Sequence, residues 1–286
     1  MLAKQTIISM KVDKKKHADA KGNAKPKSES KAKRFCVKLI RDIRQAIFVD
    51  KYNCINCGKE LANPNRYGLC DECKSKIEFL HDDICHKCGR REKSEADYCL
   101  TCQAHERHFL RNRSVCVYDG VAKTLIHRYK FGGKKYYCRY FDNTLVDKYL
   151  DEGYDCDVVV SVPISKERAR KRGYNQSQIV AKRLAESLKL PYVGECIVKS
   201  KDNIEQAKLS GKEREENVLG VYKVIDKTAV KGKRVLVVDD VLTTGATMSE
   251  VARVLYKAGA QKVEGLTICA TAYKIQSSNL SEEEKQ

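Results

Sequence analysis

Four CxxC pairs constrain this chain more than any other feature of its sequence. They fall within 49 residues and are separated from one another by 12, 11 and 10 residues. The eight cysteines are Cys54, Cys57, Cys70, Cys73, Cys85, Cys88, Cys99 and Cys102. A CxxC pair places two thiolates on one tight turn, and two pairs complete a tetrahedral Cys₄ zinc site. The spacing therefore predicts two structural zinc ions, each held by four cysteines.

Two alternatives to zinc, a disulfide framework and a redox motif, fit the chain less well. A chain of 286 residues buries a core without disulfides, and its first ten residues contain no long apolar region typical of a secretory signal. A redox CxxC is a single pair, not four in series. Both consecutive and crossed pairing of the CxxC motifs remain open at this stage. The four nearby histidines are expected on the surface: His81, His86, His105 and His108.

The formal charge of +18 favours anionic partners, but it is unevenly distributed along the chain. Residues 1–35 hold ten Lys and one Arg against three acidic residues, a net +8, and are expected to form a disordered basic tail. A short helix or linker is expected at 36–50, the zinc domain at 51–111, a second domain at 112–272 and a polar tail at 273–286. No stretch approaches the ~20 apolar residues of a membrane span. We therefore expect no membrane insertion and a cytoplasmic location.

From residue 112 onward, short apolar runs alternate with helical patterns. Strands are expected at 114–118, 157–162, 220–225, 234–239 and 263–270. Helices are expected at 121–129, 141–150, 176–188 and 247–258. Continuous apolar strands that alternate with helices are typical of a mostly parallel sheet with helices on both faces. The sequence therefore predicts an α/β fold preceded by a small Cys-rich domain.

The segment VLVVDDVLTTGATM, residues 235–248, is the most informative for function. Its apolar start predicts a buried strand, and ligands bind outside the carboxyl ends of strands in open parallel sheets. Small residues then lead into a helix, whose unpaired N–H groups and positive dipole end attract phosphate. The segment predicts a phosphate loop formed by Thr243, Thr244, Gly245, Ala246 and Thr247.

Two adjacent carboxylates, Asp239 and Asp240, precede this loop. They cannot contact phosphate themselves, because like charges repel. Ribose hydroxyls, reached directly or through Mg²⁺, suit them, since carboxylates accept hydrogen bonds and bind hard cations. The alternative is that the aspartates only end a strand and that Thr244 or Thr247 caps the helix. The combination of strand, aspartates and loop favours a phosphorylated sugar.

The stretch VLVVDDVLTTGAT resembles the phosphoribosyl-pyrophosphate signature of type I phosphoribosyltransferases. The segment VPISKERARKRGYNQSQ, which begins at Val162, resembles the ComF family pattern of Pro, basic residues and Arg-Gly-Phe-Asn-Gln, with Tyr174 at the Phe position. The stretch HRYKFGG at 127–133 and the CxxC pairs match as well. The resemblance covers roughly residues 50–272. It implies a double zinc ribbon joined to a type I phosphoribosyltransferase-like domain.

The resemblance also implies roles for individual residues. Asp239 and Asp240 would be the catalytic pair on the ribose hydroxyls, and the phosphate loop would hold the 5′-phosphate. A second loop and the basic residues beside it would hold pyrophosphate: Ser161, Pro163, Ser165, Lys166, Arg168 and Arg172. Ser165 and Lys166 replace a His-Pro pair that is common in the family. Lys208 and Arg214, in a segment expected to be mobile, would close over the ligand.

Two functions follow from the resemblance. The first is a Mg²⁺-dependent phosphoribosyltransferase, whose chemistry relies on positioning and charge without a protein nucleophile. The second is a non-catalytic accessory protein of competence and DNA uptake, with single-stranded DNA and a competence helicase as candidate partners. The sequence contains no unambiguous hood to enclose an acceptor. Binding of phosphoribosyl pyrophosphate or a related sugar phosphate is therefore predicted ahead of turnover, and an oligomer is compatible with both functions.

One further stretch, residues 128–140, interleaves aromatic and basic side chains. Such an arrangement suits single strands, because bases stack on the rings and phosphates are attracted to the cations. The alternative is an ordinary mixture of core and surface residues.

Overall fold

The computed structural model of this chain describes residues 53–63, 65, 67–92, 96–131, 138–200 and 218–272, without the side chains of 138 and 139. All of them belong to one structural unit that begins at Val49. The predicted basic tail at 1–35, the helix at 36–50 and the polar tail at 273–286 lie outside the described residues, as do Lys208 and Arg214.

In the part of the chain that the structure describes, four parallel strands form the central sheet, in the order β1-β6-β5-β2. Their bounds are β1 Asn112–Val117, β2 Val158–Ser161, β5 Arg234–Leu242 and β6 Lys262–Ala270. The central strands are almost continuously apolar because both faces are covered. Successive residues of β5 alternate between the two cores: Leu236 and Val238 belong to one, and Val235 and Val237 to the other.

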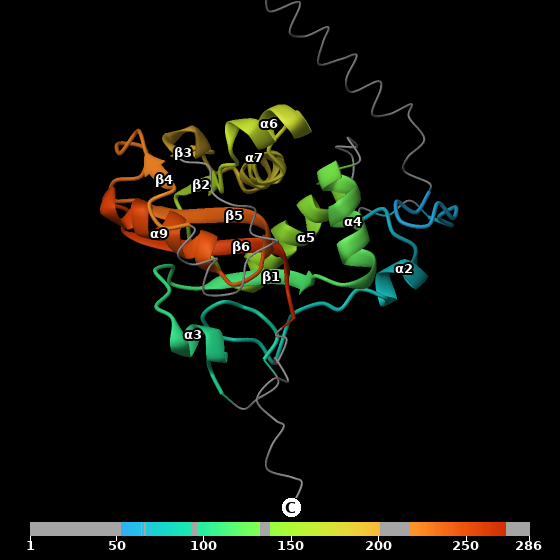
Figure 1. The fold of residues 1–286 in the computed structure, drawn as a ribbon. Helices are drawn as coiled ribbons and strands as arrows, with labels where there is room; N and C mark the ends of the chain where they lie inside the picture. Colours follow the sequence, from blue (N-terminus) through green and yellow to red (C-terminus); the bar gives the residue numbers. More distant parts are fainter. Residues whose placement is uncertain are drawn as a thin grey trace, which may run out of the picture. The chain divides into compact units, whose positions relative to one another are not determined.

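Helices cover the two faces of the sheet (Figure 1). One core contains α4 (Gly120–Phe131), α5 (Cys138–Asp151) and α7 (Gln176–Leu188). The other contains α9 (Ala246–Lys257) and the antiparallel pair β3 (Ile197–Lys199) and β4 (Tyr222–Val224). Among the described residues, none of the helices combines the length and apolar character needed to cross a membrane.

Both edges of the parallel sheet are covered by irregular segments. Beside β1, the N–H of Leu80 donates to the carbonyl of Val115 at 3.0 Å, and Val117 donates to Glu78 at 2.8 Å. Beside β2, Val159 donates to Pro191 and Val193 donates to Val159, each at 2.9 Å. These bonds satisfy edge groups that would otherwise be open to pairing with another chain.

The two halves of the Cys-rich part pack on different cores. The first half contains α2 (Asp71–Ser75) and contributes Leu69 and Ile77 to the core of α4, α5 and α7. The second half contains α3 (Leu100–Ala104) and contributes Cys88 and Cys99 to the core of α9. The segment at 78–80, which pairs with β1, joins them.

The predicted elements exist, with differences at their ends. The helix at 176–188 has the predicted bounds, whereas β5 continues three residues past Asp239, the predicted last residue. It continues because Asp239, Val241 and Leu242 pair with Thr267, Cys269 and Ala270 of β6. The elements that were not predicted include the short helices α2 and α3, the 3-10 turn Gly194–Cys196, strand β3 and the short basic helix α6 (Lys166–Arg172).

Candidate functional site

The eight CxxC cysteines form two separate groups of four. One group is Cys54, Cys57, Cys70 and Cys73, and the other is Cys85, Cys88, Cys99 and Cys102. The sulfurs of each group lie within 4.8 Å of one another, so consecutive CxxC pairs combine and the crossed arrangement is wrong. In a tetrahedral site with Zn–S bonds of about 2.3 Å, sulfurs lie roughly 3.8 Å apart. The 3.8 Å between Cys57 and Cys70 and the 3.7 Å between Cys88 and Cys99 fit zinc.

The two groups have different surroundings. In the second group, three of the four cysteines are fully buried, and the guanidinium of Arg90, itself only 5% exposed, lies 3.5 Å from Cys88 Sγ and 3.4 Å from Cys99 Sγ. In the first group Cys57 is exposed, and a neutral amide, Asn56 Nδ2, donates to Cys73 Sγ at 3.3 Å. Four thiolates and one Zn²⁺ carry a net charge of −2. Arg90 offsets part of this charge at the buried site, where solvent does not.

A cavity of about 340 Å³ opens at the carboxyl ends of β2 and β5. Eight of the predicted site residues line it together: Asp239, Asp240, Thr243, Gly245, Thr247, Pro163, Arg168 and Arg172. The first five come from the end of β5 and the start of α9, and the other three come from the segment after β2 and from α6. The parallel sheet thus brings two stretches about 70 residues apart in sequence to one cavity.

The two aspartates have different partners. Asp239 Oδ1 accepts hydrogen bonds from Ser177 Oγ at 2.8 Å and from the N–H of Asp240 at 2.9 Å. Asp240 Oδ1 lies 2.8 Å from Lys130 Nζ. Burial and the adjacent charge of Asp240 raise the pKa of Asp239 from 3.8 to about 7, although the Ser177 bond opposes the shift. Asp239 therefore changes its charge near neutral pH, a property common among functional carboxylates.

Lys130 reaches the cavity from the end of α4. Burial by itself would lower the pKa of Lys130, but the charge of Asp240 outweighs that effect and the net shift is upward. Lys130 is therefore a cation held against the aspartates in the ligand-free protein. Sequence reasoning placed it in the aromatic and basic stretch and missed this role. The sequence did contain a sign of this role. Lys130 follows Ile126 by four residues and so lies on the same, buried face of the helix, where a cation needs an acidic partner.

The predicted phosphate loop connects β5 to α9. Gly245 has φ of 84° and precedes the first residue of α9, Ala246. Thr243, Gly245 and Thr247 line the cavity, whereas Thr244 Oγ1 accepts from the N–H of Ala246 at 3.3 Å. Thr244 thus contacts the start of the helix, but the N-cap residue is Gly245, so neither Thr244 nor Thr247 caps α9 as the alternative expected. The open end of a 12-residue helix and two threonines face the cavity.

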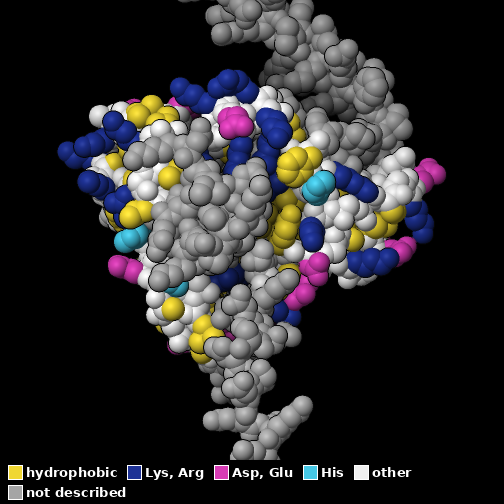
Figure 2. Space-filling view, viewed as in Figure 1, with side chains coloured by type: hydrophobic (Ala, Val, Ile, Leu, Met, Phe, Trp, Pro, Cys, Tyr) yellow, Lys and Arg dark blue, Asp and Glu magenta, His cyan; other side chains and the backbone are white. Residues whose placement is uncertain are grey.

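The remaining predicted residues that the structure describes do not line the cavity: Thr244, Ala246, Ser161, Ser165 and Lys166. Ser161 Oγ is hydrogen-bonded to Tyr192 Oη at 2.8 Å. Ser165 caps α6 by accepting from the N–H of Arg168 at 3.2 Å, and Lys166 is the exposed first residue of that helix. The basic residues of α6 belong to a concentration of Lys and Arg side chains at the top of Figure 2, where Figure 1 places α6.

Sequence reasoning missed several polar and aromatic residues of this site. Ser177 holds Asp239, Lys130 pairs with Asp240, and three more line the cavity: Tyr118, Lys199 and Tyr222. In the aromatic stretch, Tyr129 and Tyr140 are 0% and 1% exposed, so neither offers a ring to a nucleic acid base. They are core residues, as the alternative expected, while Phe131 is 61% exposed.

Comparison with known proteins links both parts of the chain to described families. The double zinc ribbon domain matches residues 45–103, and the phosphoribosyl transferase domain matches residues 147–283. Competence protein ComFC of Bacillus subtilis is 30% identical over 213 residues, which cover 70% of this chain and 83% of that protein. Competence protein F of Haemophilus influenzae is 26% identical over 219 residues, 74% of this chain and 94% of that protein.

Two further similarities extend the comparison. DNA utilization protein YhgH of Escherichia coli K12 is 26% identical over 223 residues, 71% of this chain and 97% of that protein. Among solved structures, the allosteric regulatory enzyme of purine biosynthesis is 25% identical, with a TM-score of 0.30. That match covers 44% of this chain and 24% of the enzyme.

Proposed function

The chain belongs to the ComF family, and we propose that its cavity binds phosphoribosyl pyrophosphate, or a related ribose 5-phosphate ligand, together with Mg²⁺. One observation carries the proposal: the adjacent aspartates, the phosphate loop and two arginines open into the same cavity. Each of these groups suits a different part of one ligand.

The 5′-phosphate belongs at the loop between β5 and α9. There the N-terminal N–H groups of α9 and the hydroxyls of Thr243 and Thr247 offer donors to an anion. The ribose hydroxyls belong at Asp239 and Asp240, because carboxylates accept from vicinal hydroxyls. Mg²⁺, when bound, would be held by these carboxylate oxygens and would neutralise charge on the pyrophosphate.

The pyrophosphate belongs on the β2 side of the cavity. Arg168 and Arg172 reach it from α6, and Pro163 follows β2 at its wall. Two guanidinium groups stabilise the charge that develops on a departing pyrophosphate. If the protein catalyses transfer, the 5-phosphoribosyl group passes to an acceptor of unknown identity, without a protein nucleophile.

A non-catalytic role in competence and DNA uptake is the second candidate. It is favoured by the names of the relatives, competence proteins and a DNA utilization protein, and by the basic residues over α6. Single-stranded DNA and a competence helicase are its candidate partners. The zinc thiolates fit a reducing compartment such as the cytoplasm, where we expect the protein to act.

The test is a calorimetric titration with phosphoribosyl pyrophosphate and Mg²⁺. The wild type should bind, and Asp239→Asn/Asp240→Asn should lose most of the affinity. The matched control is Asp82→Asn/Asp83→Asn, which removes another adjacent pair of aspartates, both exposed, from the zinc region. Binding by the control but not by the first double variant supports the proposal. Absence of heat with the wild type at millimolar ligand rejects it.

A further inference from the structure

The segment that leaves the second Cys₄ group runs directly beside the phosphate loop. Only four residues separate its last cysteine, Cys102, from Arg107. The N–H of His108 donates to Ser249 Oγ in the first turns of α9 at 3.1 Å, and Leu110 donates to the carbonyl of Val263 in β6 at 2.8 Å. Residues 107–110 are therefore fixed to the two elements that follow and flank the loop.

Two side chains of this segment lie against Gly245. A Cβ placed on Gly245 would lie 3.8 Å from Arg107 Nε and 3.8 Å from Phe109 Cζ. Arg107 is 6% exposed and Phe109 is fully buried. Both side chains thus border the space beside Gly245, the residue that turns the chain from β5 into α9. The guanidinium also brings positive charge close to the loop proposed to hold phosphate.

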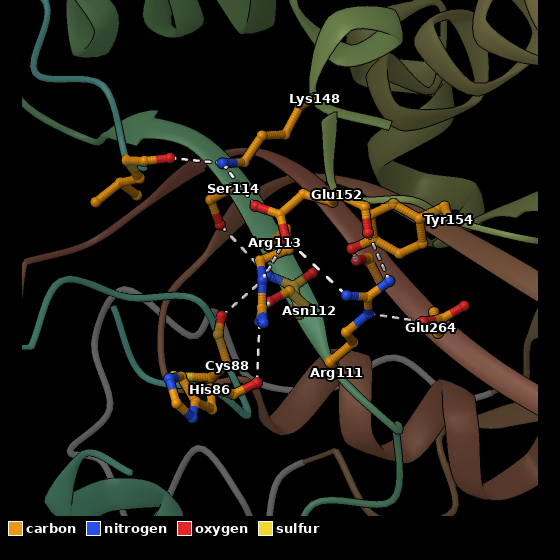
Figure 3. Close-up of polar contacts among 12 residues, drawn as sticks. His86, Cys88, Arg111, Asn112, Arg113, Ser114, Lys148, Glu152, Tyr154 and Glu264 are labelled. Atoms are coloured by element: carbon orange, nitrogen blue, oxygen red, sulfur yellow. Dashed lines mark hydrogen bonds and ion pairs between the residues drawn. The ribbon is translucent and has the colours of Figure 1, made fainter. Parts of the chain in front are cut away.

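The second Cys₄ group is itself fixed to the sheet (Figure 3). Asn112 Nδ2 donates to the carbonyl of Cys88 at 3.1 Å, and Arg113 Nη1 donates to the carbonyl of His86 at 2.9 Å. Gly89 lies so close to β1 that a Cβ there would be 2.5 Å from the carbonyl oxygen of Asn112. Asn112 Nδ2 also lies 3.4 Å from Thr267 Oγ1, and Thr267 lines the cavity.

The first Cys₄ group contacts a different part of the domain. Arg128 of α4 donates to the carbonyl of Asn56 at 2.8 Å, and Tyr67 Oη donates to Asp147 Oδ2 of α5 at 2.7 Å. These contacts are with the helices of the other core. The two groups therefore provide an internal comparison within one chain.

We propose that Arg107 and Phe109 are positioning residues for the phosphate loop, held in place by the second Cys₄ zinc site and not by the first. The proposal rests on the proposed function for its effect on ligand affinity, but its structural part does not. Zinc at the second site keeps the turn of Cys99 and Cys102 folded, and that turn fixes where the following segment begins. Loss of this zinc frees Arg107 and Phe109 from Gly245.

Amide hydrogen exchange of residues 243–249, followed by mass spectrometry, tests the structural part without any ligand. The variants are Cys102→Ser in the second group and Cys57→Ser in the first. Cys102 is partly exposed and Cys57 is exposed. We expect exchange at 243–249 to rise at least tenfold in Cys102→Ser and to stay at the wild-type rate in Cys57→Ser. Equal rates in the two variants would overturn the proposal.

Variants of the segment itself keep the test decisive if Cys102→Ser does not fold. Arg107→Met and Phe109→Ala leave all eight cysteines in place and should retain two zinc ions per chain. They should speed exchange at 243–249 and weaken binding of phosphoribosyl pyrophosphate about tenfold, with Arg107→Lys recovering part of the affinity. Wild-type exchange rates in both Arg107→Met and Phe109→Ala refute the proposal. A wild type that binds no ligand rejects the proposed function alone.

The coupling is reciprocal if both proposals hold. A ligand that stabilises the loop must also stabilise the zinc site coupled to it, because linkage between two sites acts equally in both directions. Saturating phosphoribosyl pyrophosphate should raise the equilibrium affinity for one of the two zinc ions, measured by competition with a chelator, and leave the affinity for the other unchanged. An equal change for both ions, or no change for either, in a protein that binds the ligand contradicts the coupling.

Discussion

Replacing Lys130 by methionine removes the ion pair between Lys130 and Asp240 in the cavity. Lys130 Nζ lies 2.8 Å from Asp240 Oδ1, with the two side chains 19% and 13% exposed. Breaking a fully buried ion pair costs about 3–5 kcal/mol, because the remaining charge is left unpaired. Since this pair keeps some contact with solvent, we expect Lys130→Met to lower the free energy of unfolding by about 2 kcal/mol.

The same substitution changes how binding depends on pH. The pKa of Asp239 is about 7 in the folded protein, raised from 3.8 mainly by burial and then by Asp240, while Lys130 opposes the rise. Ribose hydroxyls and Mg²⁺ bind the ionised carboxylate, so affinity should increase as pH rises through about 7. Without the cation the pKa rises further. The midpoint of the affinity curve should therefore move to higher pH in Lys130→Met.

The free energy of unfolding should fall as pH rises, whereas the ligand affinity should increase. A carboxyl group whose pKa is raised on folding binds more protons in the folded state than in the unfolded state. The contribution of Asp239 therefore lowers stability progressively as pH rises from about 4 to about 7, and it is constant above that range. Chemical denaturation at several pH values would detect this fall and a larger fall, extending to higher pH, in Lys130→Met.

Calorimetric titration with phosphoribosyl pyrophosphate and Mg²⁺ from pH 6 to 9 is the assay for the midpoint. Lys123→Met is the matched control, since Lys123 is an exposed lysine of the same helix. We expect an upward shift for Lys130→Met and the wild-type midpoint for Lys123→Met. An unchanged midpoint in Lys130→Met would refute the electrostatic reasoning. Equal shifts in both would assign the effect to net charge.

Three other predictions concern separate parts of the molecule. A chelator should remove the zinc of the group containing the exposed Cys57 first, which a colorimetric indicator would record as two phases and not one. Arg168→Gln should weaken phosphoribosyl pyrophosphate binding about tenfold but ribose 5-phosphate binding little, whereas the exposed Arg170→Gln should change neither in calorimetry. In chemical denaturation, Gly89→Ala should lower the free energy of unfolding by about 3 kcal/mol, because its Cβ would lie 2.5 Å from a carbonyl oxygen of β1. Gly58→Ala should lower it by about 1 kcal/mol, because Gly58 also has a positive φ but its Cβ would meet no atom within 4 Å.

Local sequence patterns predicted the features that depend on neighbouring residues. The CxxC spacing predicted that the eight cysteines form two groups of four, because each CxxC pair lies on one local turn. The apolar run before Asp239 predicted β5, and the small residues after it predicted a loop leading to a helix. These features need no knowledge of how distant segments meet.

Contacts between distant segments were beyond such patterns. The pairing of Lys130 with Asp240 joins α4 to β5, and the bond of Ser177 to Asp239 joins α7 to the same strand. The end of β5 depends on its register with β6, so the aspartates lie within the strand and not after it. Local periodicity carries no information about register, nor about which segment packs on Gly245.

A crystal structure of the protein with phosphoribosyl pyrophosphate and Mg²⁺ tests the proposed ligand site directly. We expect the 5′-phosphate at Thr243–Thr247, the ribose hydroxyls at Asp239 and Asp240, and the pyrophosphate beside Arg168 and Arg172. A ligand bound elsewhere, or an empty cavity in crystals grown at saturating ligand, would contradict it.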